Sequence, residues 1–390
     1  MRLVYLANNR IPSEKANSLQ IMQMCRAFLK QGAEVTLLVP RRMQPRVMRG
    51  VSDPFAYYGI AERFLIERVP CLDALEVAPA RLQHPAFALQ SATFTVSLAA
   101  NLASRPADVY YSRDPLSTVM LALMPASIRR GAVYEAHTFP GPGPRRDLHL
   151  WAIRRIGKLV CVTQGLADEY AARGVETGRL VVAPDAVELE RFTAMPAKEE
   201  ARASLGIPLD RKVACYTGHL YRWKGAHTLA LASGLLPREY LVYLVGGTEE
   251  DQQSLRRFVA ERGLSRATLT GHLSPEQVVS YLAAADVLVL PNSGADLRSS
   301  RYTSPMKLFE YMAARRPIVA SDLPALREVL CHDENAILVR PDDPAALAEG
   351  IARAGSDAAL SAQLAESAWR DVQGFSWTAR ARHILDFIGG

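Results

Sequence analysis

A lysine and a glutamate stand one helical turn apart in SSRYTSPMKLFEYMAARRPIVASD, which covers residues 299–322. Lys307 and Glu310 are i, i+3 neighbours, so on a helix both side chains share one face. A glutamate can accept hydrogen bonds from two hydroxyls of a ribose. The spacing is therefore that of a site for a charged ligand. An ion pair on a solvated helix surface is the alternative that the spacing leaves open.

The residues before Lys307 predict where this helix starts. Pro305 suits the first turn, with Ser304 or Thr303 as the cap. The backbone amides around Met306 and Lys307 would then be unpaired donors at the positive end of the helix dipole. Ribose and diphosphate contacts would in that case come from one helix start.

A second cluster follows an apolar run earlier in the chain. In YTGHLYRWKG, residues 216–225, His219, Arg222 and Lys224 occur within six residues and precede a glycine and a helix. Fixed positive charge and free amides before a helix suit a diphosphate. The alternative is a solvated basic loop.

A third stretch, LVGGTEE at residues 244–250, ends a buried run in two glycines. Gly246 and Gly247 would let a ligand approach the backbone, unless they simply form a turn. No G-x-G-x-x-G follows this run or the first run of the chain, and no Walker lysine loop occurs. The ordinary dinucleotide fingerprint is therefore absent.

These clusters follow short apolar runs that alternate with helical patterns. The first series is RLVYLA, EVTLLVP, DVYYSR, AVYEAH, KLVCVT and RLVVAP, and the second is VACYTG, YLVYLVGG, ATLTGH, DVLVLP, PIVASD and AILVRP. Such alternation is typical of βα units, so it predicts an α/β protein with parallel sheets covered by helices on both faces. Residues 187–210 contain no strand-like run and predict a linker with a short helix.

The pattern predicts two Rossmann-like, doubly wound domains that face a cleft. We expect the first over residues 1–190, the second over 191–372, and a C-terminal helix over 373–390 that packs across the domain boundary. Ligands of open parallel sheets bind beyond the carboxyl ends of the strands. The polar residues at those ends should therefore carry the function.

Composition limits the class of protein and its partners. The chain has 390 residues, 49% hydrophobic and 22% charged, which suits a globular protein with length for two domains. A net charge of +6 fits nucleotide phosphates or an acidic membrane surface, although a soluble, arginine-rich protein is the plain alternative. The basic residues lack interleaved aromatics, so nucleic acid is not an expected partner. Five scattered cysteines without metal-ligand spacing indicate thiols of a reducing compartment.

Two apolar segments of the chain could be targeting or membrane signals. The N-terminal MRLVYLANNR has too short an apolar run for a signal peptide and favours a first strand. Residues 82–104 are uncharged but too rich in polar side chains for a membrane span, so we expect an amphipathic, mostly buried helix there. These features favour a cytoplasmic protein that could attach to the inner face of a membrane.

The second half of the chain resembles the retaining glycosyltransferases of family 4, which have the two-domain GT-B fold. Five segments occur in that family's order: YTGHLYRWKG, LVGG, LTGHLSPEQVVSYLAAADVLVLPNS, SPMKLFEYMAARRPIVASDLPALREVL and NAILVRPDDPAALAEGI. The first half is similar more loosely, through RIPSEKANSLQIMQMCRAF, VTQGLADEY and VVAPDAVELERF. The resemblance implies an N-terminal acceptor-binding domain and a C-terminal domain that binds a sugar nucleotide.

The resemblance assigns roles to the clusters described above. Lys224, with Arg222, would hold the diphosphate, while His219 occupies a position where the family usually has arginine. Glu310 would take the ribose hydroxyls, and Tyr302 stands where the family usually has a second glutamate for the donor sugar. Lys224 and Glu310 are thus implied as catalytic. The implied donor-binding set is His219, Arg222, Gly246, His272, Leu273, Tyr302, Ser304, Met306 and Lys307, with the backbone at 272–273 and near 246 meeting the base.

His137 ends the run AVYEAH in the first half, and the resemblance makes it a catalytic contact near the transferred sugar. Without the resemblance, a lone histidine after a strand is more often a hydrogen-bonded structural residue. The acceptor is expected against the first domain. The candidate contacts follow its first strand and are Arg10, Ser13, Lys15 and Asn17.

Pairs of arginines in the first domain bear on the nature of the acceptor. The pairs are Arg41–Arg42, Arg129–Arg130, Arg145–Arg146 and Arg154–Arg155. They suit an anionic membrane surface or a lipid-linked acceptor, with scattered solvated arginines as the alternative.

The expected reaction moves a sugar from a nucleoside diphosphate to a glycan or lipid-linked acceptor with retention, in the synthesis of cell-surface polysaccharide or glycolipid. The leaving diphosphate gains negative charge, which Lys224, Arg222 and the helix start before Glu310 would meet. No D-x-D occurs, so we expect a metal-independent enzyme whose co-substrate is linked to UDP or GDP in preference to ADP. The alternatives are a sugar-nucleotide epimerase of the same fold and a non-catalytic paralogue that binds a nucleotide or lipid.

Overall fold

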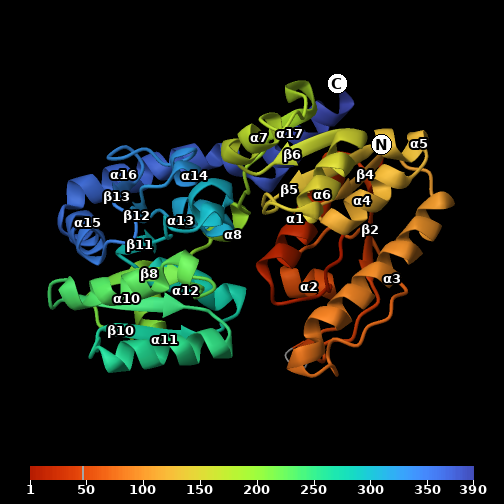
Figure 1. The fold of residues 1–390 in the computed structure, drawn as a ribbon. Helices are drawn as coiled ribbons and strands as arrows, with labels where there is room; N and C mark the ends of the chain where they lie inside the picture. Colours follow the sequence, from red (N-terminus) through yellow and green to blue (C-terminus); the bar gives the residue numbers. More distant parts are fainter. Residues whose placement is uncertain (46–47) are drawn as a thin grey trace. The chain divides into compact units, whose positions relative to one another are not determined.

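A computed structural model of the chain describes residues 1–45 and 48–390. These residues form two compact units. Unit 1 comprises residues 1–162, 166–183 and 377–390, and unit 2 comprises residues 163–165 and 184–376. Each unit has one sheet of parallel strands joined by helices, which confirms the predicted α/β class (Figure 1).

The sheet of unit 1 has the order β3-β2-β1-β4-β5-β6-β7. Its strands are β1 (Arg2–Leu6), β2 (Glu34–Pro40), β3 (Leu65–Val69), β4 (Val109–Ser112), β5 (Ala132–Ala136), β6 (Lys158–Cys161) and β7 (Leu180–Val182). Six of them lie in the predicted runs, and β3 was missed. The strand β3 lies at the sheet edge and contains Glu67 and Arg68, so no continuous apolar run marks it.

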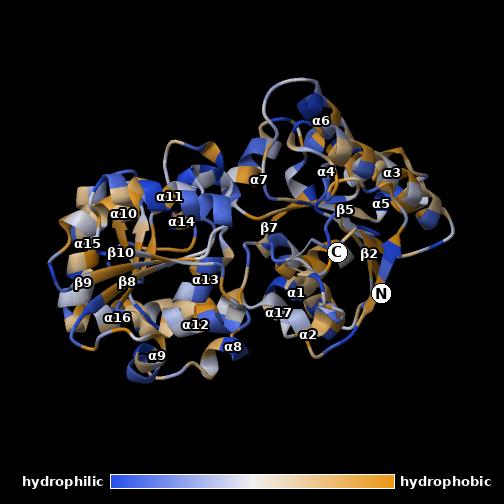
Figure 2. Ribbon diagram, turned by 90° about the horizontal axis from the view of Figure 1, so that it is seen from below, coloured by the Kyte–Doolittle hydropathy of each residue, from blue (hydrophilic) through white to orange (hydrophobic). Residues whose placement is uncertain are grey.

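The helices of unit 1 follow the strands. They are α1 (Ala16–Lys30), α2 (Pro54–Tyr58), α3 (Gln83–Ala103), α4 (Pro115–Leu123), α5 (Ala126–Arg130), α6 (Pro144–Arg155), α7 (Gln164–Ala171) and α17 (Trp377–Gly389). Although α17 ends the chain, it belongs to unit 1, where it packs beside α1 (Figure 2). The Lys158 ammonium, at the start of β6, donates to the backbone carbonyl of Phe387 near the end of α17.

Helix α3 differs from its expected environment. Only 28% of its most apolar window is buried, so the expectation of a mostly buried helix is wrong. Phe87, Leu89 and Val96 are exposed large apolar side chains on this helix. By length and composition alone, residues 80–103 could cross a membrane.

The sheet of unit 2 has the order β10-β9-β8-β11-β12-β13. Its strands are β8 (Lys212–Thr217), β9 (Tyr240–Val245), β10 (Ala267–Gly271), β11 (Val287–Leu290), β12 (Ile318–Ser321) and β13 (Ile337–Val339). They lie in the predicted second series of runs, except that β8 begins one residue earlier. The order reverses between β8 and β11. In such sheets the loops after the two strands at the reversal form the usual ligand site.

The helices of unit 2 connect these strands. They are α8 (Glu190–Thr193), α9 (Lys198–Leu205), α10 (Ala226–Leu235), α11 (Glu249–Glu261), α12 (Pro275–Ala284), α13 (Met306–Ala313), α14 (Pro324–Arg327), α15 (Pro344–Ser356) and α16 (Ala358–Val372). Short η4 (Arg222–Lys224) follows β8, and a π-helical turn, η5 (Arg298–Tyr302), precedes α13.

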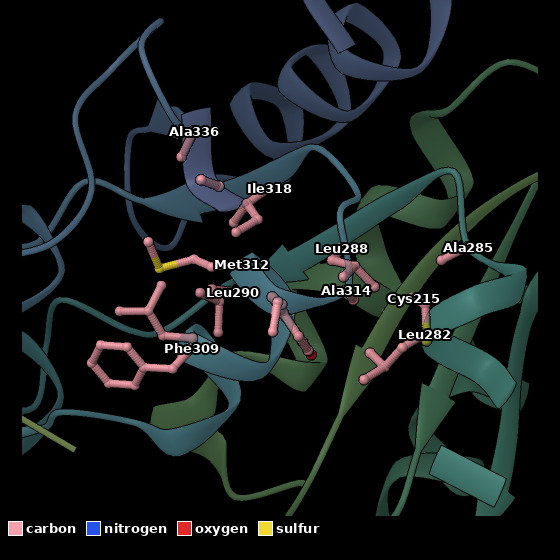
Figure 3. Close-up of a cluster of buried hydrophobic side chains, with 14 of the residues drawn as sticks. Cys215, Leu282, Ala285, Leu288, Leu290, Phe309, Met312, Ala314, Ile318 and Ala336 are labelled. Carbon is pink, nitrogen blue, oxygen red and sulfur yellow. The ribbon is translucent and has the colours of Figure 1, made fainter. Parts of the chain in front are cut away.

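The core beneath α13 fixes that helix on the sheet. Phe309 and Met312 are completely buried among side chains of the central strands, including Leu288 and Ile318 (Figure 3). The ring of Phe309 also lies 5.0 Å from that of Phe375, centroid to centroid. Since the first turn of α13 carries the predicted ligand groups, this packing decides where they lie.

We expect Phe309→Ala to lower the free energy of unfolding by about 3–5 kcal/mol, because it leaves a cavity in a fully packed core. Urea denaturation would measure the change. Leu209→Ala removes an exposed side chain and should change the value by less than about 0.5 kcal/mol. Equal effects of the two substitutions would contradict this account of the core.

Candidate functional site

Three neighbouring strands of unit 2 end in glycines with left-handed backbones. Gly218, Gly246 and Gly271 have φ values of 117°, 110° and 88° at the ends of β8, β9 and β10. A Cβ on Gly246 would lie 2.6 Å from the carbonyl oxygen of Gly218. The backbone at Gly246 is therefore crowded by another loop, which is a packing reason for the glycine that its sequence position alone did not reveal.

The loop after β8 is pinned to the end of β11. A Cβ on Gly225 would lie 1.6 Å from the carbonyl oxygen of Pro291, and φ at Gly225 is 76°, so only glycine fits there. The carbonyl of Trp223 accepts hydrogen bonds from the Ser293 amide (2.9 Å) and the Ser299 hydroxyl (3.1 Å). These contacts hold Lys224 at the reversal point of the sheet.

Lys224 is a half-buried cation beside aromatic rings. Its ammonium lies 5.1 Å from the centroid of the Trp223 ring. Burial lowers the pKa of Lys224 to about 8, while Asp251 acts in the opposite direction. The sequence predicts that Lys224 is a cation that binds a phosphate. In the structure, the carboxylate of Asp251 raises the pKa of Lys224 but does not offset the effect of burial.

His219 and Arg222 lie differently from Lys224. The His219 ring stacks on Tyr221 at 5.0 Å and is 4.0 Å from the Asp251 carboxylate. Arg222 is exposed and lines a pocket of about 310 Å³. That pocket is bounded by Leu220, Tyr221, Arg222, Trp223, His227, Asp251 and Ser254. Its lining does not include Lys224 or Lys307, although Arg222 and Lys224 belong to the same short turn, η4.

The start of α13 differs from the predicted cap. Pro305 occupies the N-cap position and no side chain caps the helix. The Ser304 hydroxyl instead accepts a hydrogen bond from the Asp185 amide, and the Thr303 hydroxyl donates to the Arg298 carbonyl. The backbone amides of Met306 and Lys307 donate no hydrogen bond within residues 1–45 and 48–390. The predicted cap is therefore wrong, but the helix start offers the unpaired donors that were expected.

Lys307 is a buried lysine whose ammonium lies against an aromatic ring. It is 8% exposed, its ammonium lies 3.6 Å from the centroid of the Tyr216 ring, and it has no hydrogen-bond partner among the described residues. Burial and the neighbouring Lys224 hold its pKa well below the ordinary value, against the opposing charge of Glu310. The surface ion pair considered for Lys307 and Glu310 is therefore not what the structure contains.

Glu310 lies on the same face of α13 and its pKa is raised by burial, while Arg191 and Lys307 act to lower it. The next residue, Tyr311, ties α13 to the end of β8, because its hydroxyl accepts a hydrogen bond from the Thr217 amide at 2.7 Å. Lys224, which ends η4, is thus an electrostatic neighbour of Lys307, and Lys307 of Glu310 in the same helix, α13.

The remaining donor-side candidates are placed as follows. Tyr302 is buried in the π-helical turn η5, a kind of turn that is frequent at functional sites. His272 is exposed directly after Gly271, and Leu273 packs partly against the hydrophobic core. Among the described residues no cluster of three or more His, Cys, Asp or Glu side chains could hold a metal ion.

The acceptor-side candidates follow β1 in unit 1. Arg10 pairs with Glu76 at 2.8 Å, and Ser13 is buried with its amide donating to the Tyr58 hydroxyl. Lys15 is exposed at the start of α1. The buried amide oxygen of Asn17 has no hydrogen-bond partner in the described part of the chain. Ser13 therefore has a structural role in this conformation, and Asn17 is the candidate with unused hydrogen-bonding capacity.

His137 lies at the carboxyl end of β5, with its Nε2 atom 2.5 Å from a carboxylate oxygen of Glu135. Glu135, two residues before His137 in β5, was not predicted from the sequence as a site residue. A glutamate within the apolar run AVYEAH was the available signal, because a charged side chain in a central strand must be buried. Arg113, after the neighbouring strand β4, was also missed, and its guanidinium donates to the Gln20 side chain at 2.5 Å.

Comparisons with known proteins cover both halves of the chain. A curated relative, a D-inositol 3-phosphate glycosyltransferase of Corynebacterium urealyticum, is 30% identical over 57% of this chain and 53% of its own length. The putative teichuronic acid biosynthesis glycosyltransferase TuaC of Bacillus subtilis is 29% identical over 49% of this chain and 46% of its own. The matches thus extend over about half the length of these relatives.

Solved structures match the whole chain in fold. Sucrose-phosphate synthase from Thermosynechococcus elongatus superposes with a TM-score of 0.79 at 20% identity, covering 99% of this chain and 97% of that one. HepE from Anabaena in complex with UDP-glucose has a TM-score of 0.76 at 18% identity, covering 100% and 99%. These likenesses confirm the GT-B fold class.

Family models agree with this assignment. The model described as Glycosyltransferase Family 4 matches residues 19–191, and the model described as Glycosyl transferases group 1 matches residues 197–371. With one model over each half, the chain belongs to the group 1, family 4 glycosyltransferases.

Proposed function

We propose that the protein transfers a sugar from a nucleoside diphosphate to a glycan or lipid-linked acceptor with retention of configuration. The observation that carries this proposal is the buried Lys307 ammonium without a hydrogen-bonded anion, beside Lys224 and the open start of α13. A buried ammonium without such a partner is costly, and a diphosphate would supply the missing charge and acceptors.

The same groups suit the chemistry of the leaving diphosphate. Cleavage of a glycosyl–phosphate bond places negative charge on the leaving oxygen, where preorganised cations and helix-start amides lower the barrier. Lys224, Lys307 and the amides of α13 supply both without a metal ion. Glu310 would accept the ribose hydroxyls, and the leaving phosphate would serve as the base for the acceptor hydroxyl.

The donor is proposed to be a UDP- or GDP-linked sugar. Support for UDP comes from HepE, which was solved in complex with UDP and with UDP-glucose. Tyr302 is buried where the family usually has a carboxylate for the donor sugar, so the way in which the sugar is held should differ at that point.

The acceptor is proposed to be anionic or lipid-linked. By sequence, unit 1 has 25 Lys and Arg against 15 Asp and Glu, a net charge of +10, whereas unit 2 has 21 against 25. Helix α3 of the same unit exposes large apolar side chains. A basic and partly apolar surface suits anionic lipid, so we propose work at the cytoplasmic face of a membrane, in cell-surface polysaccharide or glycolipid synthesis.

Turnover without added metal tests the proposed reaction. UDP- and GDP-sugars with candidate acceptors should give a new glycoside of the donor's anomeric configuration, and EDTA should leave the rate unchanged, because fixed cations replace a metal. NMR of the product would read the configuration. An isomerised free sugar would indicate the epimerase, and a strict metal requirement would overturn the electrostatic argument.

Substitutions at the proposed donor site test the assignment of residues. We expect Glu310→Ala and Lys224→Ala each to lower turnover at least about 100-fold, since each removes a charged contact to donor or leaving group. Nucleotide release would be measured beside thermal unfolding. The matched controls Glu349→Ala and Lys212→Ala lie away from this site and should retain wild-type turnover. Wild-type rates from either site variant would refute the assignment.

Lys307→Met tests the unpaired ammonium directly, because methionine has a similar length without the charge. We expect the variant without ligand to unfold at a higher temperature than the wild type, and to bind UDP or GDP at least about tenfold more weakly. Lys212→Met is the control, since Lys212 also lies over an aromatic ring, at 5.5 Å from Tyr240, but is partly exposed.

The pH dependence of that stability difference has a definite sign. The pKa of Lys307 is well below its ordinary 10.5, so between the two values the unfolded chain binds a proton that the folded chain does not. Wild-type stability from this group therefore rises with pH. The advantage of Lys307→Met in urea titrations should therefore be larger at neutral pH than at about pH 10. An advantage that grows with pH would contradict this account.

A further inference from the structure

The centre of unit 1 contains a completely buried carboxylate. Glu135, in β5, is 0% exposed and has hydrogen-bonding neighbours from several elements. The Gln20 side chain of α1 donates to it at 2.7 Å, the Tyr111 hydroxyl of β4 also donates, and His137 Nε2 lies 2.5 Å away. The carboxylate is thus fixed on three sides.

The C-terminal helix supplies the compensating cation. Arg380 of α17 is 5% exposed, and its guanidinium is 3.1 Å from Glu135. The same guanidinium donates to the Ala183 carbonyl at 3.1 Å. Burial alone would raise the pKa of Glu135, but Arg380, His137 and Arg113 outweigh it and hold that pKa well below the ordinary value. The last helix of the chain therefore keeps a central carboxylate charged.

Such a network is weak evidence for stability alone, because replacing a buried ion pair by packed apolar groups is often neutral or favourable. Its outer end is His137, which is partly exposed at the carboxyl end of β5. Carboxyl ends of parallel strands are where ligands bind. The network therefore connects a candidate sugar contact to the C-terminal helix.

We propose that Glu135 is a positioning residue for His137, and that Arg380 makes the C-terminal helix part of that arrangement. This rests on the proposed function, in which His137 contacts the transferred sugar. The carboxylate fixes the ring orientation and favours the imidazolium form, which can hydrogen-bond to a sugar hydroxyl or to developing negative charge.

Other titratable groups face Glu135 but do not change charge near neutral pH. They are Tyr5 of β1, with Cys25 of α1 near it, Tyr111 of β4, Arg113 after β4 and Arg380 of α17. Burial raises the pKa values of Tyr5, Cys25 and Tyr111 well above their ordinary range, so they stay neutral. His137 is the histidine of this cluster, and the measurements below follow its protonation.

Glu135→Gln keeps the shape and removes the charge. We expect kcat to fall at least about tenfold, and the alkaline limb of the pH–rate profile to move to lower pH, because the imidazolium loses its counter-charge. UDP or GDP binding, which involves unit 2, should stay at the wild-type value. A purely structural role would lower thermal stability without moving the pH profile of the remaining activity, and that result would overturn the proposal.

Arg380→Gln removes a cation beside the Glu135–His137 pair, so it should move the alkaline limb of the pH–rate profile to higher pH, opposite to Glu135→Gln. The double variant should lose less activity than the sum of the two single effects. If Glu135→Gln does not fold, Arg380→Gln tests the proposal without it. Arg382→Gln is the matched control, since Arg382 is exposed on the same helix and donates only a long hydrogen bond, 3.4 Å, to Gln31. A wild-type pH–rate profile in Arg380→Gln would show that α17 has no part in positioning His137.

The pairing can be separated from the reaction by NMR titration of the His137 imidazole, assigned with His137→Gln. Protonation of His137 should require lower pH in Glu135→Gln than in the wild type. If the wild type transfers no sugar but this difference is found, the proposed reaction fails and the pairing stands. An unchanged titration in a folded Glu135→Gln would overturn the pairing whatever the activity.

Discussion

The ammonium of Lys307 is a charge that unit 2 buries without a hydrogen-bonded anion, and the architecture around it follows from that constraint. The Tyr216 ring faces the ammonium at 3.6 Å, a cation–π contact worth about 2 kcal/mol when desolvated. That is less than the several kcal/mol that burying an unpaired charge costs. The rest of the unit must therefore hold the group in place until an anion arrives.

Rigid backbone contacts provide that support. Gly225 packs against Pro291 too closely for any side chain, the Trp223 carbonyl accepts two hydrogen bonds, and Tyr311 ties α13 to β8. Below them, the core under Phe309 admits little movement. A site held this way pays its electrostatic cost in the unliganded state and needs little rearrangement when a diphosphate binds, which is the condition for effective charge stabilisation.

The buried charge of unit 1 is compensated within the chain, in contrast to that of Lys307 in unit 2. Glu135 is more deeply buried than Lys307, yet Arg380, Gln20, Tyr111 and His137 satisfy it within the chain. The surface of this unit is strongly basic, while unit 2 is slightly acidic by sequence. Unit 2 thus contains a buried cation, Lys307, without a hydrogen-bonded anion. Unit 1 contains a buried anion, Glu135, that is compensated within the chain, and this unit has a net charge of +10 by sequence. This division agrees with a donor site in unit 2 and an anionic acceptor on unit 1.

The sequence by itself determined the fold class and showed that the candidate ligand groups follow strand ends, because strands buried on both faces leave continuous apolar runs. It missed β3, whose edge position permits charged residues, and it assigned a cap at Ser304 although that hydroxyl bonds to Asp185. Only the tertiary structure decided that Lys307 is buried without an anion and that Arg380 reaches Glu135 across 245 residues of sequence. Helical spacing says which side chains share a face, but desolvation and charge compensation depend on what long-range packing brings against that face.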